Sequence, residues 1–303
     1  MKIGVAGSGA VGGYFGALLK RAGHEVTFLA RGKSLERMKA EGITVENGGE
    51  TFKVAGTFTD RYELFSDIDL LLFCVKSTNT VEVAANFQPY LKKSCTIMTF
   101  QNGVDNEEIL SEMFGSGRII SVATYIQAIV TETGSVKQIG VTPRLIIGAL
   151  DNHSAKHADE ISAIFNEANI ETFPSNNIIA VKWKKLLWNV TFNPITALME
   201  AKVGAVYDDD GLYQTAMNIC KESIQVARAS GIEVEEDFYE TIFAQGQLAR
   251  AHQTSMLQDK HKGKPLEIES ICGYIAKKGR ELKVETPILE TIYHLLYYQT
   301  SNS

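Results

Sequence analysis

Several features that mark other protein classes are missing from this sequence of 303 residues. The four cysteines show no C-x-x-C or Cys-His spacing, so no metal site is indicated and reduced thiols of a cytosolic protein are expected. No apolar run approaches the length of a membrane span, and no signal peptide precedes the first expected strand. The net charge of -6 disfavours nucleic acid and anionic membranes as partners. These absences predict a cytoplasmic globular protein.

Residues 1–31 carry the pattern of a dinucleotide-binding strand-helix-strand unit. An apolar strand is expected over residues 2–6, and the G-x-G-x-x-G motif follows it as Gly7, Ser8, Gly9, Ala10, Val11 and Gly12. In this motif the first glycine permits a tight turn, the second lets the pyrophosphate approach the backbone, and the third lets the helix pack closely on the strand. The helix N-terminus binds the phosphates. The alternative is an ordinary strand-to-helix turn, which the flanking strand and amphipathic helix make less favoured.

The end of the second expected strand, residues 25–29, indicates which dinucleotide is bound. Sites that select NAD place Asp or Glu about 20 residues beyond the motif to bind the ribose 2′-hydroxyl. This sequence has Arg31 and Lys33 there, and no carboxylate. A guanidinium makes forked contacts with a phosphate, so NADPH is the predicted cofactor. A solvated loop arginine is the alternative.

The length exceeds what one hydrophobic core normally serves, so two domains are expected. Apolar strands over residues 69–75 and 96–100 continue the parallel sheet and end at Lys76 and at Asn102, where ligands bind in such folds. Asn-Gly-Gly at residues 47–49 predicts a hairpin inserted into this plan. Four more strands are expected to complete the sheet with an antiparallel edge; they cover residues 119–124, 125–130, 135–139 and 144–147.

A helix over residues 155–169 and a short strand over 170–173 precede Pro174, where the domain boundary is expected. Residues 1–174 are therefore predicted to form an α/β Rossmann-type domain, and residues 175–303 an all-α domain. The helical domain shows apolar stripes with a period of 3.6 residues. Gly231 is a predicted helix stop, and Thr286 with Pro287 is a predicted helix start.

One helix of this second domain carries a column of polar residues. Lys185, Asn189 and Asn193 are spaced i, i+4, i+8, so they share one face of a helix that is otherwise rich in Trp, Leu and Phe. Buried amides require hydrogen-bond partners, which a polar ligand can provide. Pro194 removes one backbone donor next to the column. The alternative is a solvated face, with Lys184 and Lys185 pointing outward.

Six short segments, taken together and in order, resemble the ketopantoate reductase family. They are G-S-G-A-V-G with Arg31, C-V-K-S at 74–77, Q-N-G at 101–103, K-L-L-W-N-V-T-F-N-P at 185–194, S-M-L-Q-D at 255–259 and E-I-E-S-I-C-G at 267–273. The resemblance implies NADPH-dependent reduction of the 2-keto acid 2-dehydropantoate to pantoate, in the pathway to pantothenate.

The resemblance also implies roles for individual residues. Lys185 is implied as the catalytic lysine and Glu267 as a carboxylate near it. Lys76 and Asn102 are implied as cofactor contacts. Substrate contacts are implied for four residues: Asn102, Asn189, Asn193 and Ser255.

One loop departs from the family pattern, which leaves the substrate more open than the reaction. Family members often have a polar loop ending in Gly-Glu-Leu where this sequence has residues 199–206. The alternatives are another branched 2-keto acid as the substrate, or a non-catalytic protein that senses NADPH. The oligomeric state is also open, with a homodimer among the alternatives. The segment 259–264 is expected to be a solvated loop.

Overall fold

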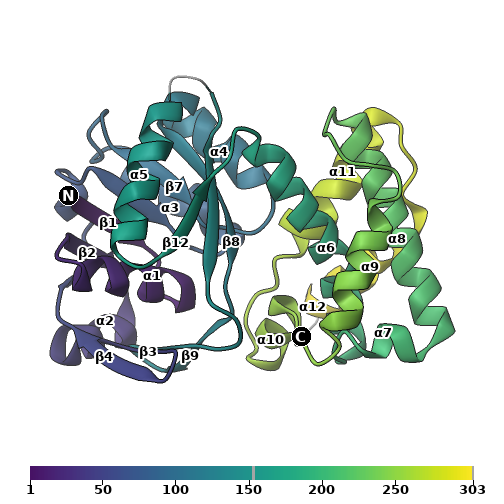
Figure 1. The fold of residues 1–303 in the computed structure, drawn as a ribbon, viewed down its shortest axis with the longest axis horizontal. Helices are drawn as coiled ribbons and strands as arrows, with labels where there is room; N and C mark the ends of the chain where they lie inside the picture. Colours follow the sequence, from purple (N-terminus) through teal and green to yellow (C-terminus); the bar gives the residue numbers. More distant parts are fainter. Residues whose placement is uncertain (152–153, 302–303) are drawn as a thin grey trace. The chain divides into compact units, whose positions relative to one another are not determined.

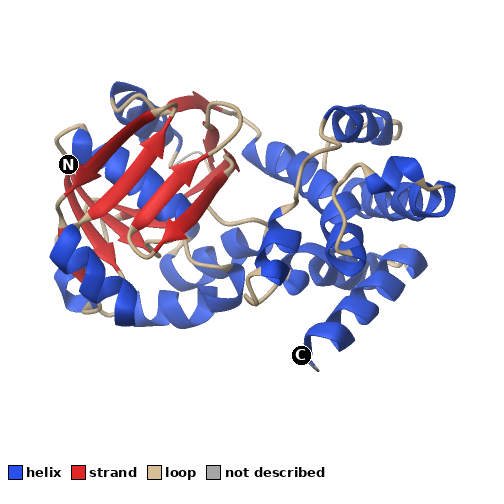
Figure 2. Cartoon of the chain, turned by 90° about the horizontal axis from the view of Figure 1, so that it is seen from below, coloured by secondary structure: helices blue, strands red, loops and turns tan. Residues whose placement is uncertain are grey.

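The computed structural model describes residues 1–151 and 154–301 of the chain. It divides into two compact units. The N-terminal unit comprises Met1–Gln101 and Asn106–Ile178, and the C-terminal unit comprises Asn102–Asp105 and Ile179–Ser303. Within the described residues, all strands belong to the N-terminal unit, as the colouring in Figure 2 shows. Each unit is described by itself below.

The N-terminal unit is built on an eight-stranded sheet (Figure 1). Its strands are β1 (Lys2–Ala6), β2 (Glu25–Leu29), β5 (Thr57–Thr59), β6 (Leu70–Phe73), β7 (Thr96–Thr99), β8 (Ile119–Tyr125), β11 (Arg144–Ala149) and β12 (Glu171–Pro174). They lie in the order β12-β11-β8-β7-β6-β1-β2-β5. Neighbouring strands are parallel except β8 and β11, which are antiparallel. The predicted Rossmann-type sheet with an antiparallel edge is therefore confirmed.

Helices cover both faces of this sheet. In β6, Leu70 and Leu72 belong to one core cluster, whereas Leu71 and Phe73 belong to another, because successive side chains of a strand point to opposite faces. The first cluster includes residues of α1 (Ala10–Arg21) and α5 (Ala155–Glu167). The second includes residues of α3 (Thr80–Phe87) and α4 (Asp105–Phe114). Burial on both faces explains the uninterrupted apolar sequences of the central strands.

A second, four-stranded sheet corrects one prediction. Its strands are β3 (Ile43–Asn47), β4 (Glu50–Val54), β9 (Ala128–Glu132) and β10 (Ser135–Gln138), in the order β4-β3-β10-β9. The hairpin β3–β4 was predicted, but β9 and β10 were wrongly assigned to the main sheet. Strand β10 pairs with β3 of that hairpin instead, and β9 pairs with β10. Both strands pack against α1, where Gly13 leaves room for Val136. Strand periodicity reports burial of one face but not the identity of the neighbouring strand.

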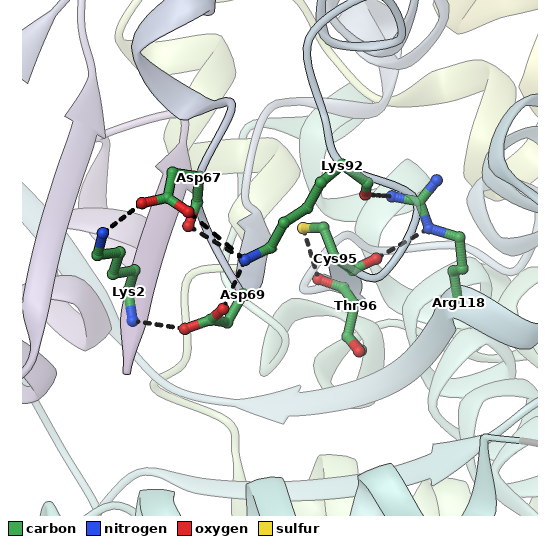
Figure 3. Close-up of polar contacts among 7 residues, drawn as sticks. All are labelled: Lys2, Asp67, Asp69, Lys92, Cys95, Thr96 and Arg118. Atoms are coloured by element: carbon green, nitrogen blue, oxygen red, sulfur yellow. Dashed lines mark hydrogen bonds and ion pairs between the residues drawn. The ribbon is translucent and has the colours of Figure 1, made fainter.

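Polar contacts join the amino ends of four strands of the main sheet, at the edge opposite to the glycine-rich turn. Asp69, just before β6, accepts hydrogen bonds from the backbone N–H of Lys2 (3.0 Å) and the ammonium of Lys92 (2.7 Å). Arg118, just before β8, donates to the carbonyls of Lys92 (2.8 Å) and Cys95 (2.9 Å), which precede β7. Figure 3 shows these contacts. They hold neighbouring strand ends together, so this edge has a structural role.

Helices make up the C-terminal unit, which confirms the predicted fold class. They are α6 (Ile178–Met199), α7 (Ala205–Asp208), α8 (Asp210–Ala229), α9 (Phe238–Leu248), α10 (Ser255–His261), α11 (Tyr274–Leu282) and α12 (Pro287–Ser301), with a π-helical turn, η4, over Glu269–Gly273. Short elements of the N-terminal unit complete the fold: α2 (Gly32–Glu41), η1 (Tyr62–Phe65), η2 (Ser77–Asn79) and η3 (Ser116–Arg118).

The helix ends of the C-terminal unit follow the signals in the sequence. Helix α8 stops just before Gly231, whose φ of 78° favours glycine. Helix α12 begins at Pro287, as predicted. Its first free N–H groups, those of Ile288 (3.1 Å) and Leu289 (2.9 Å), donate to the carboxylate of Glu222 on α8. This long-range cap fixes α12 to α8 and was not predicted.

Candidate active site

The glycine-rich turn forms the tight connection that its sequence predicts. Gly7 follows β1 with a φ of 98°, a backbone conformation that other residues rarely adopt. A Cβ added at Gly12 would lie 2.2 Å from the Gly7 carbonyl oxygen, so only glycine allows α1 to start this close to the strand. The Ser8 hydroxyl donates to the carbonyl of Leu29 (2.8 Å), which ties the turn to the end of β2.

Gly9 differs from these two glycines because the protein's own packing does not require it. A Cβ added at Gly9 would meet nothing within 4 Å, so the missing side chain leaves open space. Gly9 is the N-cap of α1, which has no side-chain cap and no acidic residue in its first turn. Open space beside the N–H groups of Ala10 and Val11 fits a bound pyrophosphate.

Two basic residues follow the neighbouring strands at the same edge of the sheet. Strand β1 lies between β2 and β6, and all three are parallel, so their carboxyl ends coincide. Arg31 is exposed two residues beyond the end of β2, where it precedes α2. Lys76 is half-buried three residues beyond β6, where it precedes η2. Both can therefore reach an anionic ligand at this edge.

The predicted polar column lies on α6 in the C-terminal unit. The apolar faces of α6 belong to the core of that unit, with Leu187 and Val190 fully buried, and Trp183 is core as expected. Along the column, Lys185 and Asn189 are half-buried and Asn193 is 1% exposed. The alternative of a solvated helix face is therefore wrong for Asn193, the most buried residue of the column. Helix α6 continues through Pro194.

Two consecutive hydrogen bonds connect Lys185 to Glu267 through the side chain of Asn102. The Lys185 ammonium donates to Asn102 Oδ1 (3.0 Å), and Asn102 Nδ2 donates to Glu267 Oε2 (3.1 Å). An amide is suited to this position, because one end accepts from a cation while the other donates to a carboxylate. Glu267 is 6% exposed and lies two residues before η4. These three residues are separated by 83 and 165 positions along the chain, and Asn102 belongs to the C-terminal unit.

Asn193 has an unusual environment for a buried amide. Neither Asn193 Oδ1 nor Nδ2 has a hydrogen-bond partner among the described residues. Leaving a buried polar group unpaired costs about 1–3 kcal/mol. Native proteins accept such a cost where a ligand completes the hydrogen bonds. Ser255, the first residue of α10, is exposed and belongs to the same unit.

The segment 259–264 was predicted to be a solvated loop, which is confirmed for residues 262–264 but wrong for residues 259–261. Helix α10 extends to His261, and Lys260 is largely covered. Its ammonium donates to the carbonyl of Ala197 (2.8 Å) and to Gln299 Oε1 (2.9 Å). The start of α10 was also missed: Thr254 is its N-cap and accepts from the N–H of Leu257 (3.3 Å). A threonine ahead of an apolar run is a helix-start signal that could have found this boundary.

The remaining chemistry of the chain is limited. The described residues contain no group of three His, Cys, Asp or Glu side chains that could hold a metal ion. Cys95, Cys220 and Cys272 are buried and Cys74 is half-buried, all without disulfides. Burial raises the pKa of Cys95 and of Cys220 to about 11, which leaves these thiols unreactive. Across the described ranges, no helix combines the length and apolar character needed to cross a membrane.

The Rossmann-like unit with its glycine-rich turn is typical of dinucleotide-dependent oxidoreductases. Comparison with known families agrees. Residues 3–152 match the family described as ketopantoate reductase PanE/ApbA, and residues 177–298 match the C-terminal domain of the same family. The chain therefore belongs to the ketopantoate reductase family.

Individual relatives extend over the whole chain. A 2-dehydropantoate 2-reductase of Pyrococcus horikoshii is 32% identical over 290 residues, which cover 95% of this chain and 94% of the relative. The crystal structure of a ketopantoate reductase from Ralstonia eutropha is 28% identical and superimposes with a TM-score of 0.93, covering 100% of this chain and 99% of that one. A ternary complex of D-mandelate dehydrogenase with NADH and anilino(oxo)acetate shares the fold, with a TM-score of 0.92, 22% identity and coverage of 100% and 99%.

Proposed function

We propose that this chain reduces 2-dehydropantoate to pantoate and uses NADPH as the reductant. Relatives that carry the name 2-dehydropantoate 2-reductase, at about 30% identity, support this substrate. The observation that carries the proposal is the hydrogen-bonded chain from Lys185 through Asn102 to Glu267. A proton donor held in this way is what the reduction of a keto group requires.

Reduction of a 2-keto acid needs a hydride at the carbonyl carbon, a proton at the carbonyl oxygen, and donors that hold the carboxylate. A reduced nicotinamide dinucleotide supplies the hydride when it is bound. The glycine-rich turn, with open space at Gly9 and uncapped N–H groups on α1, suits its pyrophosphate. The chain's own residues supply the remaining functions.

Lys185 is the proposed proton donor. Its ammonium stabilises the negative charge that develops on the carbonyl oxygen and then transfers a proton to it. The contact with Asn102 Oδ1 orients the ammonium without neutralising it, because an amide oxygen carries no net charge. Glu267 acts through Asn102: by accepting from Nδ2 it fixes which end of the amide faces the lysine. Asn102 is therefore proposed to orient the proton donor Lys185, in addition to its proposed contact with the cofactor.

Neutral polar groups are proposed to hold the rest of the substrate. The unpaired buried amide of Asn193 provides both a donor and an acceptor. Asn189 lies one turn earlier on the same face of α6, and Ser255 begins α10. Such groups can bind the carboxylate and the terminal hydroxyl of 2-dehydropantoate. A site built to bind a hydroxyl group discriminates strongly against analogues that lack it.

The proposed preference for NADPH rests on Arg31. The guanidinium stands exposed just beyond β2, at the edge where Gly7 and Lys76 also lie, and its surroundings in the sequence contain no carboxylate to bind a 2′-hydroxyl. A 2′-phosphate satisfies this arrangement through a bidentate contact. Lys76 is a proposed second contact to the cofactor.

Steady-state oxidation of NADPH and NADH with a panel of 2-keto acids tests the proposal. The expected result is turnover of 2-dehydropantoate with a marked preference for NADPH. A preference for another branched 2-keto acid, such as 2-ketoisovalerate, would overturn the substrate while leaving the reductase. Binding of NADPH without turnover of any keto acid would instead indicate a sensing role and would overturn the enzymatic function.

A further inference from the structure

Two threonines in the C-terminal unit form a hydrogen bond between helices that the chemistry described above does not use. Thr196 lies near the end of α6, and Thr254 is the residue just before α10. Their hydroxyl oxygens are 2.7 Å apart although the residues are 58 positions apart in the chain. Both side chains are buried, at 1% and 0% exposure. Burial of two hydroxyl groups is favourable only if both make hydrogen bonds, so the other hydrogen-bond partners of each threonine must be considered.

The surrounding contacts determine the direction of this hydrogen bond. Thr196 Oγ1 lies 2.8 Å from the carbonyl oxygen of Phe192 and 3.1 Å from that of Asn193, and it must donate to satisfy either. A hydroxyl has one proton, so Thr254 is the donor toward Thr196. Thr254 Oγ1 in turn accepts from the N–H of Leu257. The hydroxyls therefore form one ordered relay from the first turn of α10 to the backbone of α6.

This relay ends at residues that the proposed function places around the substrate. Asn193, with its unpaired amide, contributes one of the carbonyls that face Thr196. Ser255 directly follows Thr254 and opens α10. The relay thus sets how the backbone that carries Ser255 lies relative to the backbone that carries Asn193.

Lys260 provides a second link between the same two helices. Its ammonium donates to the carbonyl of Ala197, the residue after Thr196, and lies 3.1 Å from Glu200 Oε1 at the end of α6. A cation at a helix C-terminus is favourable because the last carbonyls lack intrahelical partners. The side chain remains 18% exposed, so this link lies closer to the surface than the threonine pair. Helix α10 has only seven residues and depends on such tertiary links for its position.

We propose that the Thr196–Thr254 pair is a positioning device that sets Ser255 relative to Asn193 and thereby determines the affinity and turnover of the 2-keto acid substrate. This inference rests on the proposed function, because it assumes that Ser255 and Asn193 contact the substrate. Neither threonine is a catalytic residue: both act through their neighbours. Thr254, the N-cap of α10, is buried, whereas Ser255, the first residue of α10, is exposed.

The test compares Thr196→Val with Thr191→Val in steady-state kinetics and thermal unfolding. Valine keeps the shape of threonine and removes the hydroxyl. Thr191 is a matched control because it is also fully buried on α6 and also donates to a carbonyl one turn earlier, that of Leu187 (2.7 Å). It lies two residues before Asn193 on α6 and takes no part in the Thr196–Thr254 hydrogen bond. Thr196→Ser retains the hydroxyl and serves as the rescue variant.

We expect Thr196→Val to lower kcat/KM for the 2-keto acid by about 10- to 100-fold, the scale of a small misplacement of binding groups. The KM for NADPH should stay within about twofold of wild type, since a small local shift in α10 leaves the glycine-rich turn intact. Thr191→Val should leave both values near wild type even if it lowers Tm as much. Thr196→Ser should restore most of kcat/KM. Equal kinetics for the two valine variants would overturn the proposal.

Two further measurements keep the outcome decisive. If Thr196→Val does not fold, Lys260→Met, which removes the more exposed link between the same two helices, should also lower kcat/KM for the keto acid. An unchanged kcat/KM in that variant would overturn the proposal. Amide hydrogen exchange separates this inference from the proposed function. In Thr196→Val the amides of α10 should exchange at least about tenfold faster than in Thr191→Val, even if wild type reduces no keto acid. Equal exchange would refute the relay itself.

Discussion

Replacement of Asn102 by alanine tests most directly whether this residue orients the proposed proton donor, Lys185. Asn102 makes hydrogen bonds at 3.0 and 3.1 Å with two charged groups, Lys185 and Glu267. A hydrogen bond to a charged group contributes about 1.5–3 kcal/mol, so losing the contact that orients the ammonium should lower kcat by about 10- to 150-fold. Lys185→Ala removes the acid itself and should lower kcat by about 100-fold or more.

A double-mutant cycle shows whether Asn102 and Lys185 depend on each other in the proton transfer. If Asn102 acts by holding Lys185, the double variant should be about as slow as Lys185→Ala alone, because residues of one unit are not additive. Independent roles would multiply the two losses to about 1,000-fold or more. Stopped-flow measurement of NADPH oxidation under single-turnover conditions reports the step concerned. The neighbouring Lys184→Ala is the control, since Lys184 pairs with Glu235 near the surface (3.5 Å) and should be kinetically silent. Multiplicative losses in the double variant would refute this account of the acid.

Three further predictions concern the cofactor, the substrate and stability. Arg31→Ala should raise the KM for NADPH by the equivalent of about 1–3 kcal/mol and leave NADH almost unchanged, whereas equal losses with both cofactors would exclude a 2′-phosphate contact. The kcat/KM for 2-dehydropantoate should exceed that for 2-ketoisovalerate by about 10⁴-fold, and a ratio of only about 10–200 would indicate an apolar pocket. The hydrogen bond from Lys92 lowers the pKa of Asp69, so this carboxylate stabilises the fold above its unfolded pKa of about 3.9, and the contribution is lost as pH falls through the lower folded value. Because both side chains are about a third exposed or more, Asp69→Asn should cost at most about 1 kcal/mol in urea unfolding at pH 7, and a difference from wild type that persists unchanged below pH 3 would contradict this cause.

Local patterns in the sequence were sufficient for most elements of secondary structure. The G-x-G-x-x-G turn predicted the start of α1, because only glycine fits the φ of Gly7 and the close approach at Gly12. The i, i+4, i+8 spacing placed Lys185, Asn189 and Asn193 on one face of α6, since 3.6 residues per turn is a property of every α-helix. Uninterrupted apolar strands predicted a sheet covered on both faces.

What the sequence alone could not determine are the contacts between distant segments. Strand periodicity does not name a partner, so the pairing of β10 with β3 required the packing of both against α1. The position of Asn102 between Lys185 and Glu267 joins residues up to 165 positions apart, and no local spacing encodes it. The partners of Lys260 and the Thr196–Thr254 pair are of the same kind. Local geometry follows from the order of the residues, whereas these contacts exist only because packing in the hydrophobic cores brings distant segments together.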